Sequence, residues 1–365
     1  MTEHLDVVVI GAGVMGAAAA WQLADRGREV TVLERAEPAH AGGASHGEVR
    51  NLNFAYTEPE YQAMLRESVR LWDELEERSG QTLLSRHGLV DHGDDPRHDL
   101  VLEALLANGI EAGFLRLDEA SERWPGIRFE GRVLHMPGAG TIRAEGSVRA
   151  MLGLGARLRT AEVLAISLAD DGVRLEVDGD RIVARSAVVT AGAWTGRLLG
   201  ALLPLPRLTV TQEQPAAFAP WDAGTPWPSF NHRKAAVHDD WPATVYGMPS
   251  PGEGVKAGWH GTGPVVDPDR RSFEPEPAQR AALQRYARDW LPGVDPEELV
   301  DISCTYTTTP DTDFVLDSSG PLVVAAGFSG HGFKFAPAVG RIVADLADGI
   351  PAPARFRGAR LGSAR

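Results

Sequence analysis

The sequence contains one cysteine, Cys304, among 365 residues. A single cysteine cannot form a disulfide within the chain, so the fold needs no oxidising compartment, and chemistry at this sulfur is that of a thiol or a thioether. Long apolar runs are also missing, because no stretch reaches the ~18 residues typical of a membrane-spanning helix. Acidic residues precede the first apolar run, unlike the basic start of a signal peptide. We therefore expect a soluble, cytoplasmic protein.

An excess of positive charge is absent as well. Lys and Arg number 36 against 50 Asp and Glu, which gives a net charge of −14. Such a field repels phosphates, so we expect neither nucleic acid nor a membrane surface as a partner. The histidines and the lone cysteine show no metal-ligand spacing, and no G-x-S-x-G elbow occurs. The sequence therefore predicts neither a metal site nor a Ser-His-Asp triad.

The length and composition bound the architecture. Hydrophobic residues make up 43% of the chain, and there are no internal repeats or low-complexity tracts. A chain of this length exceeds what one hydrophobic core usually serves. We expect two domains or one elaborated α/β domain.

A βαβ unit is predicted at the N-terminus. The apolar run 7–10 reads as a buried strand, the glycine turn 11–16 opens an alanine-rich helix at 17–24, and 29–34 reads as the next strand. In the turn, Gly11 permits the bend, Gly13 lets the backbone approach a pyrophosphate, and Gly16 allows close helix packing. Glu34 ends the second strand and suits the ribose hydroxyls of an adenosine. This motif predicts a dinucleotide site but leaves FAD and NAD open.

Further elements are predicted from periodicity. They are a helix at 58–79, a hairpin of 173–177 with 181–189, a strand at 322–327, a loop at 328–334 and a helix at 338–348. Residues 203–275 hold much of the Pro and Trp, with short strands at 244–246 and 254–258. We interpret them as part of a second, sheet-rich domain. The tail after Pro351 is expected to fray.

Several sequence blocks, spread over nearly the whole chain, match one family in the same order. They are the turn at 11–16, SHGEVR at 45–50 with AY at 55–56, AGAW at 191–194, Lys256 with His260, CTYT at 304–307 with PD at 310–311, and GFSGHGFKF at 327–335. In these blocks the chain resembles the monomeric sarcosine oxidase and N-methyltryptophan oxidase family of amine-oxidising flavoproteins.

The resemblance implies a D-amino-acid-oxidase-like α/β architecture. A Rossmann-like FAD-binding domain is expected from residues 1–80, 141–202 and 301–365. A mixed-sheet substrate domain is expected from residues 81–140 and 203–300.

The resemblance also implies the cofactor and its contacts. FAD is expected to be attached covalently to Cys304 through the 8α-carbon of the flavin, and Arg50 favours the thiolate that forms the bond. The expected FAD-binding residues are Gly11, Gly13, Met15, Gly16, Glu34, Arg35, Ser45, His46, Arg50, Ala191, Gly192, Trp194, Cys304, Gly327, Gly330, His331, Gly332 and Lys334.

The family's catalytic roles map onto six residues here. Arg50 and Lys334 are expected to hold the substrate carboxylate, and Lys256 is expected to activate oxygen beside the reduced flavin. His260, Tyr246 and Tyr306 are expected to line the substrate cavity.

The implied reaction is the oxidation of a secondary amine that carries a carboxylate, such as an N-methyl amino acid, by a monomeric enzyme with oxygen as acceptor and peroxide as product. Cyclic imino acids and fructosyl amino acids remain alternative substrates. A dehydrogenase with another electron acceptor and a flavin-binding sensor without turnover remain alternative functions.

Three features depart from the family pattern. Asn53 stands where familiar members have a second arginine, and the segment 229–245 is longer than in the sarcosine and N-methyltryptophan enzymes. Trp259 is bulkier than expected for a sarcosine-sized pocket. These differences predict a substrate other than sarcosine itself.

Overall fold

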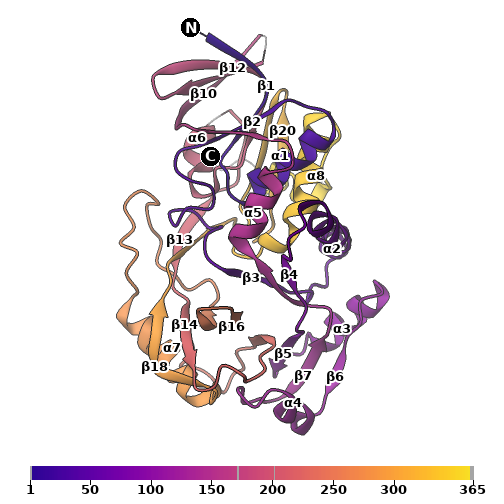
Figure 1. Cartoon of the computed structure of the whole chain (residues 1–365), viewed down its shortest axis with the longest axis vertical. Coiled ribbons are helices and arrows are strands. Elements are labelled where there is room, and N and C mark those ends of the chain that lie inside the picture. Colours follow the sequence, from indigo (N-terminus) through magenta and orange to yellow (C-terminus); the bar gives the residue numbers. More distant parts are fainter. Residues whose placement is uncertain (1, 171, 201, 362–365) are drawn as a thin grey trace.

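The computed structural model describes residues 2–170, 172–200 and 202–361. These residues form two large sheets, which lie in the upper and lower parts of Figure 1. The colours of the upper part show that segments from the start, the middle and the end of the chain lie side by side there. The expected α/β fold, with a sheet assembled from separated segments, is confirmed.

The first sheet contains the predicted βαβ unit. Its strands are β1 (Thr2–Ile10), β2 (Val30–Glu34), β9 (Arg157–Thr160), β10 (Val163–Ala169), β11 (Gly172–Val177), β12 (Asp180–Val189), β20 (Val315–Ser319) and β21 (Leu322–Ala326). The order is β10-β11-β12-β1-β2-β9, and β21 pairs with both β12 and β20. Strand β1 runs parallel to β2 and β12, whereas β11 and β12 form the predicted antiparallel hairpin.

Helices cover this sheet. They are α1 (Val14–Asp25), α2 (Pro59–Ser79), α5 (Ala144–Leu152), α6 (Thr195–Leu199) and α8 (Ala336–Ala347), with a 3-10 turn η1 (Gly192–Trp194). Helix α1 packs closely on α8, because a Cβ at Gly340 would lie only 2.4 Å from the carbonyl oxygen of Ala18. The longest helix, α2, ends at Gly80 in the left-handed region with φ +66°, as the predicted range implies. Among the described residues no helix combines the length and the apolar character needed to traverse a bilayer.

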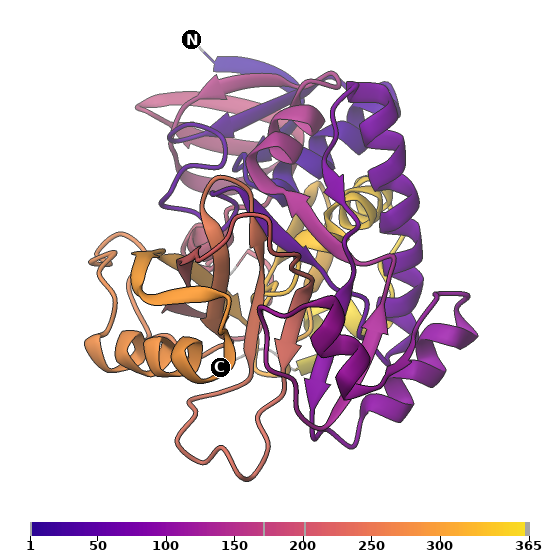
Figure 2. The same cartoon turned by 60° about the horizontal axis from the view of Figure 1, so that its bottom comes forward.

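The second sheet lies beside the first. Its strands are β5 (Leu89–Gly93), β6 (Gly113–Leu115), β7 (Arg132–Met136), β14 (Ala216–Pro220), β15 (Ser229–His232), β16 (Val245–Ser250), β17 (Gly254–Trp259) and β18 (Val294–Asp301). Their order is β18-β14-β17-β16-β15-β5-β7-β6. Figure 2 shows α7 (Pro277–Trp290) at one end of this sheet, and α3 (His98–Ala107) with α4 (Leu117–Arg123) at the other.

Two small sheets and three short turns complete the described structure. The sheets are β3 (Val49–Leu52), β8 (Gly140–Arg143) and β4 (Leu84–Ser85), and β13 (Thr209–Glu213) with β19 (Cys304–Thr308); the 3-10 turns are η2 (Phe333–Phe335), η3 (Ala354–Phe356) and η4 (Gly358–Leu361). The β13–β19 pair places Cys304 opposite Glu213. The loop predicted at 328–334 overlaps the 3-10 turn η2, so its last two residues are in regular structure.

The expectation that the tail after Pro351 frays is wrong for its described part. Phe356 is fully buried, and Arg360 forms an ion pair of 2.8 Å with Asp311. An apolar anchor and a charge pair offset the entropy cost of ordering this segment. The last residues of the tail, 362–365, lie outside the described residues.

Candidate functional site

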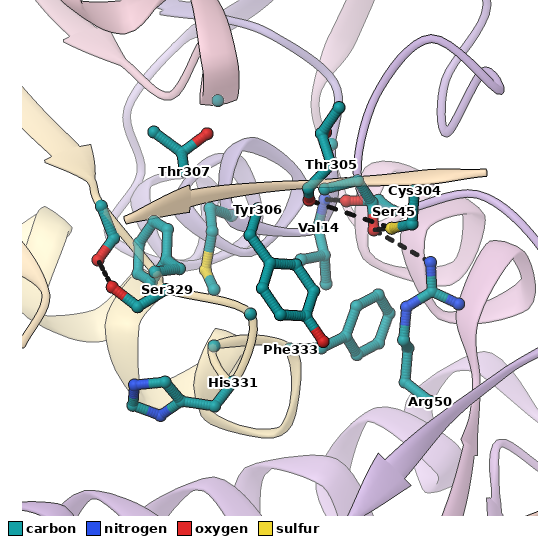
Figure 3. A pocket seen from close by; sticks show the side chains of 18 of the residues that line it. Val14, Ser45, Arg50, Cys304, Thr305, Tyr306, Thr307, Ser329, His331 and Phe333 are labelled. Carbon is teal, nitrogen blue, oxygen red and sulfur yellow. Dashed lines mark hydrogen bonds between the residues drawn. The ribbon is translucent and has the colours of Figure 1, made fainter. Parts of the chain in front are cut away.

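A cavity of about 720 Å³ opens at the carboxyl ends of β1 and β2, which is where parallel α/β sheets bind ligands. Its wall continues over the loop 39–45, β3, β16, β17, β19 and the loop 327–334. Figure 3 shows that Arg50, Tyr306 and Phe333, which come from β3, β19 and the loop 327–334, lie around one space. The cavity therefore joins the nucleotide-type turn to the second sheet.

The glycine turn forms one end of the cavity. Gly11 has φ +100°, and a Cβ at Gly16 would lie 1.9 Å from the carbonyl oxygen of Gly11, so neither position admits a side chain. Gly13 stands at the N-terminus of α1 without a side-chain cap. The backbone N–H of Val14 donates to Ser45 Oγ at 3.0 Å. Apart from this one bond to Ser45, no side chain caps the helix N-terminus, which suits a pyrophosphate as predicted.

Glu34 lies at the end of β2 with 6% of its surface exposed. Its carboxylate accepts hydrogen bonds from the backbone N–H groups of Ala12 at 2.7 Å and Ala36 at 3.1 Å. A carboxylate offers about four acceptor directions, so capacity remains for ribose hydroxyls. Nearby, the Arg35 guanidinium lies 3.9 Å from the centre of a ring of Trp194, and both side chains bond to Asp269. These contacts fix the Arg35 and Trp194 side chains in the cavity wall close to Glu34.

Arg50 and Cys304 lie on the same side of the cavity (Figure 3). The Arg50 guanidinium donates to the carbonyl oxygens of Val49 at 2.8 Å, Ala44 at 2.9 Å and His46 at 2.6 Å. Cys304 Sγ lies 3.9 Å from the same Ala44 oxygen. Because its partners are neutral and no carboxylate among the described residues pairs with it, Arg50 keeps its full positive charge.

Lys256 projects from β17 with 7% of its surface exposed. Among the described residues its ammonium group has neither a hydrogen-bond partner nor an ion-pair partner. Burial, helped by the charge of Arg50, lowers the pKa of Lys256 to about 8, although Cys304 and Glu253 oppose this shift. A fixed positive charge with unused donors is therefore available inside the cavity.

Lys334 is the second buried lysine of the cavity, with 5% exposure. Its Nζ donates to Tyr56 Oη at 3.0 Å and to the carbonyl oxygen of His331 at 2.7 Å. Both partners are neutral, and burial lowers the pKa of Lys334 to about 7. Among the described residues no carboxylate pairs with Lys334, so the charged form would gain an opposite charge from a bound carboxylate.

Aromatic side chains from β16, from β19 and from the residue after β17 form one wall of the cavity. The ring of His260 lies 5.4 Å from Tyr306 and 6.4 Å from Tyr246, and Tyr306 Oη lies 3.4 Å from His260 Nδ1. His260 is exposed toward the open cavity, but desolvation by the surrounding protein, together with the charges of Lys334 and Arg233, lowers its pKa to about 4. The imidazole is therefore neutral at pH 7. Gly330 is required against this wall, because a Cβ there would lie 2.1 Å from the Tyr306 ring.

The predicted residues fall into two groups in the structure. All of them line the cavity except Gly16, which lies beneath the turn, and His46. His46 Nδ1 contacts the carbonyl oxygen of Gly43 at 3.0 Å, so its ring orders the loop. Burial lowers the pKa of His46 to about 4. His331 contacts Tyr56 Oη at 3.2 Å and the carbonyl oxygen of Thr312 at 3.2 Å. Met15, Ala191, Gly192, Gly327 and Gly332 lie in the wall.

The expectation that Trp259 narrows the substrate pocket is wrong. Trp259 and Lys256 are three residues apart on β17, so their side chains point to opposite faces of the strand. Trp259 packs in the core against Tyr286, with ring centres 5.7 Å apart, and against Trp241 at 5.9 Å. The cavity is therefore not reduced by this residue.

Sequence reasoning missed two polar residues of the cavity. Tyr56 was part of the matching blocks, but its hydrogen bond to Lys334 depends on the packing of η2 beside β3. Arg233 lines the cavity and donates from Nε to Asp91 Oδ1 at 2.6 Å. It lies in the long segment 229–245, yet nothing in the sequence separates it from the other arginines, because Asp91 reaches it only through the pairing of β15 with β5.

These residues fit an FAD. Side chains are excluded at Gly11 and Gly16 by the packing of the turn against Thr190, which leaves the backbone around Gly13 open to a pyrophosphate, and Glu34 has free acceptor capacity at the adenosine end. The other end holds the positive charges of Arg50, Lys256 and Lys334, which would stabilise the negative charge of a reduced flavin ring. The donor set therefore matches both ends of this cofactor.

Comparisons with known proteins agree with this geometry. The model of the FAD dependent oxidoreductase family matches residues 6–346. Monomeric sarcosine oxidase of Bacillus sp. (strain B-0618) is 31% identical over 374 residues, which cover 95% of this chain and 93% of that protein. N-methyl-L-tryptophan oxidase of Salmonella agona is 31% identical over 361 residues, covering 94% and 95%.

Solved structures show the same fold. NikD, described as an unusual amino acid oxidase essential for nikkomycin biosynthesis, superimposes with a TM-score of 0.84 at 27% identity and full coverage of both chains. L-proline dehydrogenase from P. horikoshii gives a TM-score of 0.84 at 22% identity, also with full coverage. The chain therefore belongs to the family of FAD-dependent amine oxidoreductases that includes monomeric sarcosine oxidase and N-methyl-L-tryptophan oxidase.

Proposed function

We propose that this protein oxidises a secondary amine that carries a carboxylate, of the N-methyl amino acid class, and passes the electrons to oxygen to give hydrogen peroxide. The observation that carries the proposal is Lys334, a buried ammonium group with only neutral partners, in the same cavity as the nucleotide-type turn. FAD, when bound, accepts a hydride equivalent from the carbon next to the amine nitrogen.

The side chains divide the remaining work. Lys334 holds the carboxylate, and Arg50 adds the long-range attraction of its charge together with the guanidinium N–H groups that its three carbonyl contacts leave free. Tyr246 and Tyr306 form an apolar wall, and neutral His260 adds no charge that would repel an amine. The wall therefore favours the neutral amine, the form that can give up a hydride.

Lys256 is proposed to promote the reaction with oxygen. A preorganised positive charge in a buried site stabilises the negative charge that develops as oxygen accepts an electron. Lys256 has this charge and no competing partner among the described side chains.

Cys304 is proposed to hold FAD through a thioether to the 8α-carbon. Cys304 would supply the sulfur of this thioether; forming it replaces the S–H bond and one C–H bond of the methyl group by a C–S bond, and the cofactor with oxygen as final acceptor would take up the two electrons released. Arg50, which donates to the same Ala44 carbonyl oxygen that Cys304 Sγ approaches, would stabilise negative charge on the ring.

We also propose that the protein is cytoplasmic and acts as a monomer; the name of its Bacillus relative, monomeric sarcosine oxidase, supports the second part. The FAD-binding domain is proposed to comprise residues 1–80, 141–202 and 301–365, and the substrate domain residues 81–140 and 203–300. The strands of the first sheet fall within the former ranges, and those of the second sheet within 89–136 and 216–301.

Loss of the Lys334 charge is expected to weaken carboxylate binding. In Lys334→Met, a simple aliphatic carboxylic acid should bind roughly 10- to 100-fold more weakly, because a charge-assisted hydrogen bond in a buried site is lost. Flavin difference spectra measure the dissociation constant. An uncharged amide of the same acid is the control, and its affinity should not change. Equal losses for the acid and the amide would contradict the assignment.

The oxygen reaction is expected to slow as the pH rises through the pKa of Lys256, which is about 8 in the protein chain alone and is raised by the negative charge of a reduced flavin. The ammonium form of Lys256 predominates below this pKa and is lost above it. Stopped-flow mixing of reduced enzyme with oxygen at pH 7 and 9.5 measures the rate constant. In Lys256→Arg the charge persists at both pH values, so the decline should disappear. A decline that remains in this variant would assign it to another group.

The reaction itself is tested by anaerobic mixing with a panel of amines. N-methyl amino acids should bleach the flavin spectrum, and the same amines should yield peroxide in air. Bleaching without peroxide would indicate a dehydrogenase, and bleaching by cyclic imino acids or fructosyl amino acids alone would change the substrate class. Failure of every amine would favour a flavin-binding sensor.

A further inference from the structure

Glu130, His232 and His238 bring their side chains together outside the cavity. His232 Nε2 lies 2.8 Å from Glu130 Oε1, and His238 Nε2 lies 3.1 Å from the same oxygen. One potential ligand atom from each residue lies within 4.8 Å of the other two. His232 ends β15, His238 lies in the segment before β16, and Glu130 precedes β7, 102 residues before His232.

The two imidazole rings are fixed by their surroundings. His232 is fully buried, and its Nδ1 lies 3.1 Å from Tyr286 Oη. The ring of His238 stacks on Trp241, with centres 3.9 Å apart and planes inclined by 7°. The side chain of Glu130 is 28% exposed, so one side of the cluster is open to water. The ligand atoms are therefore held in place before any ion arrives.

We propose that Glu130, His232 and His238 bind a divalent cation of the zinc class. In a tetrahedral zinc site with bonds of ~2.0–2.1 Å, neighbouring ligand atoms lie ~3.3 Å apart, so the observed 2.8 Å and 3.1 Å require only a small expansion. Two imidazoles and one carboxylate are a common zinc ligand set, and the exposed side of Glu130 leaves room for water as a fourth ligand.

Protons can be accommodated at the site. Each neutral imidazole carries its proton on Nδ1 when Nε2 binds a metal. For His232 this proton is donated to Tyr286 Oη. In His238 a proton on Nδ1 removes the acceptor of a weak hydrogen bond, which the backbone N–H of Ala235 donates at 3.4 Å. Binding of the metal ion therefore breaks one weak hydrogen bond and the two imidazole contacts to Glu130, and the bonds to the metal replace them.

The site would anchor the long segment 229–245 to the strand β7. Asn231 and Arg233 flank His232 and line the cavity, whereas the three ligands do not. A bound cation would fix the position of these two cavity residues without taking part in chemistry. The role is structural and does not depend on the identity of the amine.

The test is metal binding by the purified holoenzyme after removal of adventitious metals with a chelator. One Zn²⁺ per chain should bind, Co²⁺ should give tetrahedral absorption bands in difference spectra, and Zn²⁺ should raise the melting temperature. Glu130→Gln and His238→Gln should weaken Zn²⁺ binding by about 100-fold or more, because loss of a second-shell partner alone costs 10- to 100-fold. The control is His4→Gln, which removes an exposed histidine and should retain binding.

Binding of no stoichiometric metal would overturn the proposal, since the cluster would then be hydrogen-bonded only. Equal affinity in all variants, or loss in His4→Gln, would likewise overturn it by placing the metal elsewhere. If the cluster variants do not fold, X-ray absorption of the Zn²⁺-loaded unmodified protein decides: two imidazole ligands support the site, and any other number refutes it.

Discussion

Lys256→Met is expected to slow the reaction of the reduced flavin with oxygen by roughly 100- to 1000-fold, the loss typical when one preorganised electrostatic group is removed from an active site. Lys256 is buried and has no partner among the described side chains, so no neighbouring group takes over its charge. Methionine fills a similar volume without the charge. Stopped-flow spectroscopy of reduced enzyme mixed with oxygen measures the effect directly.

Amine-driven reduction of the flavin should change far less in the same variant, because Lys334 and Arg50, the proposed ligands of the carboxylate, are unchanged. The matched control is Lys234→Met, which makes the same substitution at an exposed lysine. Its oxygen reaction should equal that of the unmodified protein. Similar oxygen rates in Lys256→Met and Lys234→Met would exclude the proposed role.

Cys304→Ala is expected to abolish covalent flavin attachment completely, because the chain has no second thiol. After acid precipitation, flavin fluorescence should remain in the pellet of the unmodified protein and move to the supernatant for the variant. Mass spectrometry of the intact unmodified chain should show the added mass of one FAD.

Cys304→Ser is a second variant of nearly the same size and should behave like the alanine variant. Both should still bind FAD without a covalent bond, because the glycine turn and Glu34 are unchanged. Release of all flavin from the unmodified protein would disprove the linkage and leave the FAD site itself intact.

Local patterns were sufficient to predict much of the first sheet. The βαβ unit, the hairpin β11–β12 and helix α2 follow from periodicity and glycine positions, and all three are observed. Trp259 was misplaced, although strand periodicity was enough to put it on the face opposite Lys256. The family resemblance, rather than periodicity, supplied most of the cavity residues.

Contacts between distant segments were beyond the sequence. Glu130 reaches His232 and His238 only because the pairings β15–β5 and β5–β7 bring their ends together. Arg233 and Asp91 meet for the same reason. The tail also ordered against expectation, since the burial of Phe356 depends on a surface built by other elements. Such pairings are set by the whole fold and leave no local pattern.

The distribution of lysines affects chemical coupling of this protein. The chain has three lysines, of which Lys256 and Lys334 line the cavity and Lys234 is exposed. Among the lysines, Lys234 is therefore the one that bulky acylating reagents and activated supports should modify. A small acylating reagent that enters the cavity meets two amines with lowered pKa values, partly unprotonated near pH 8, and should modify them first.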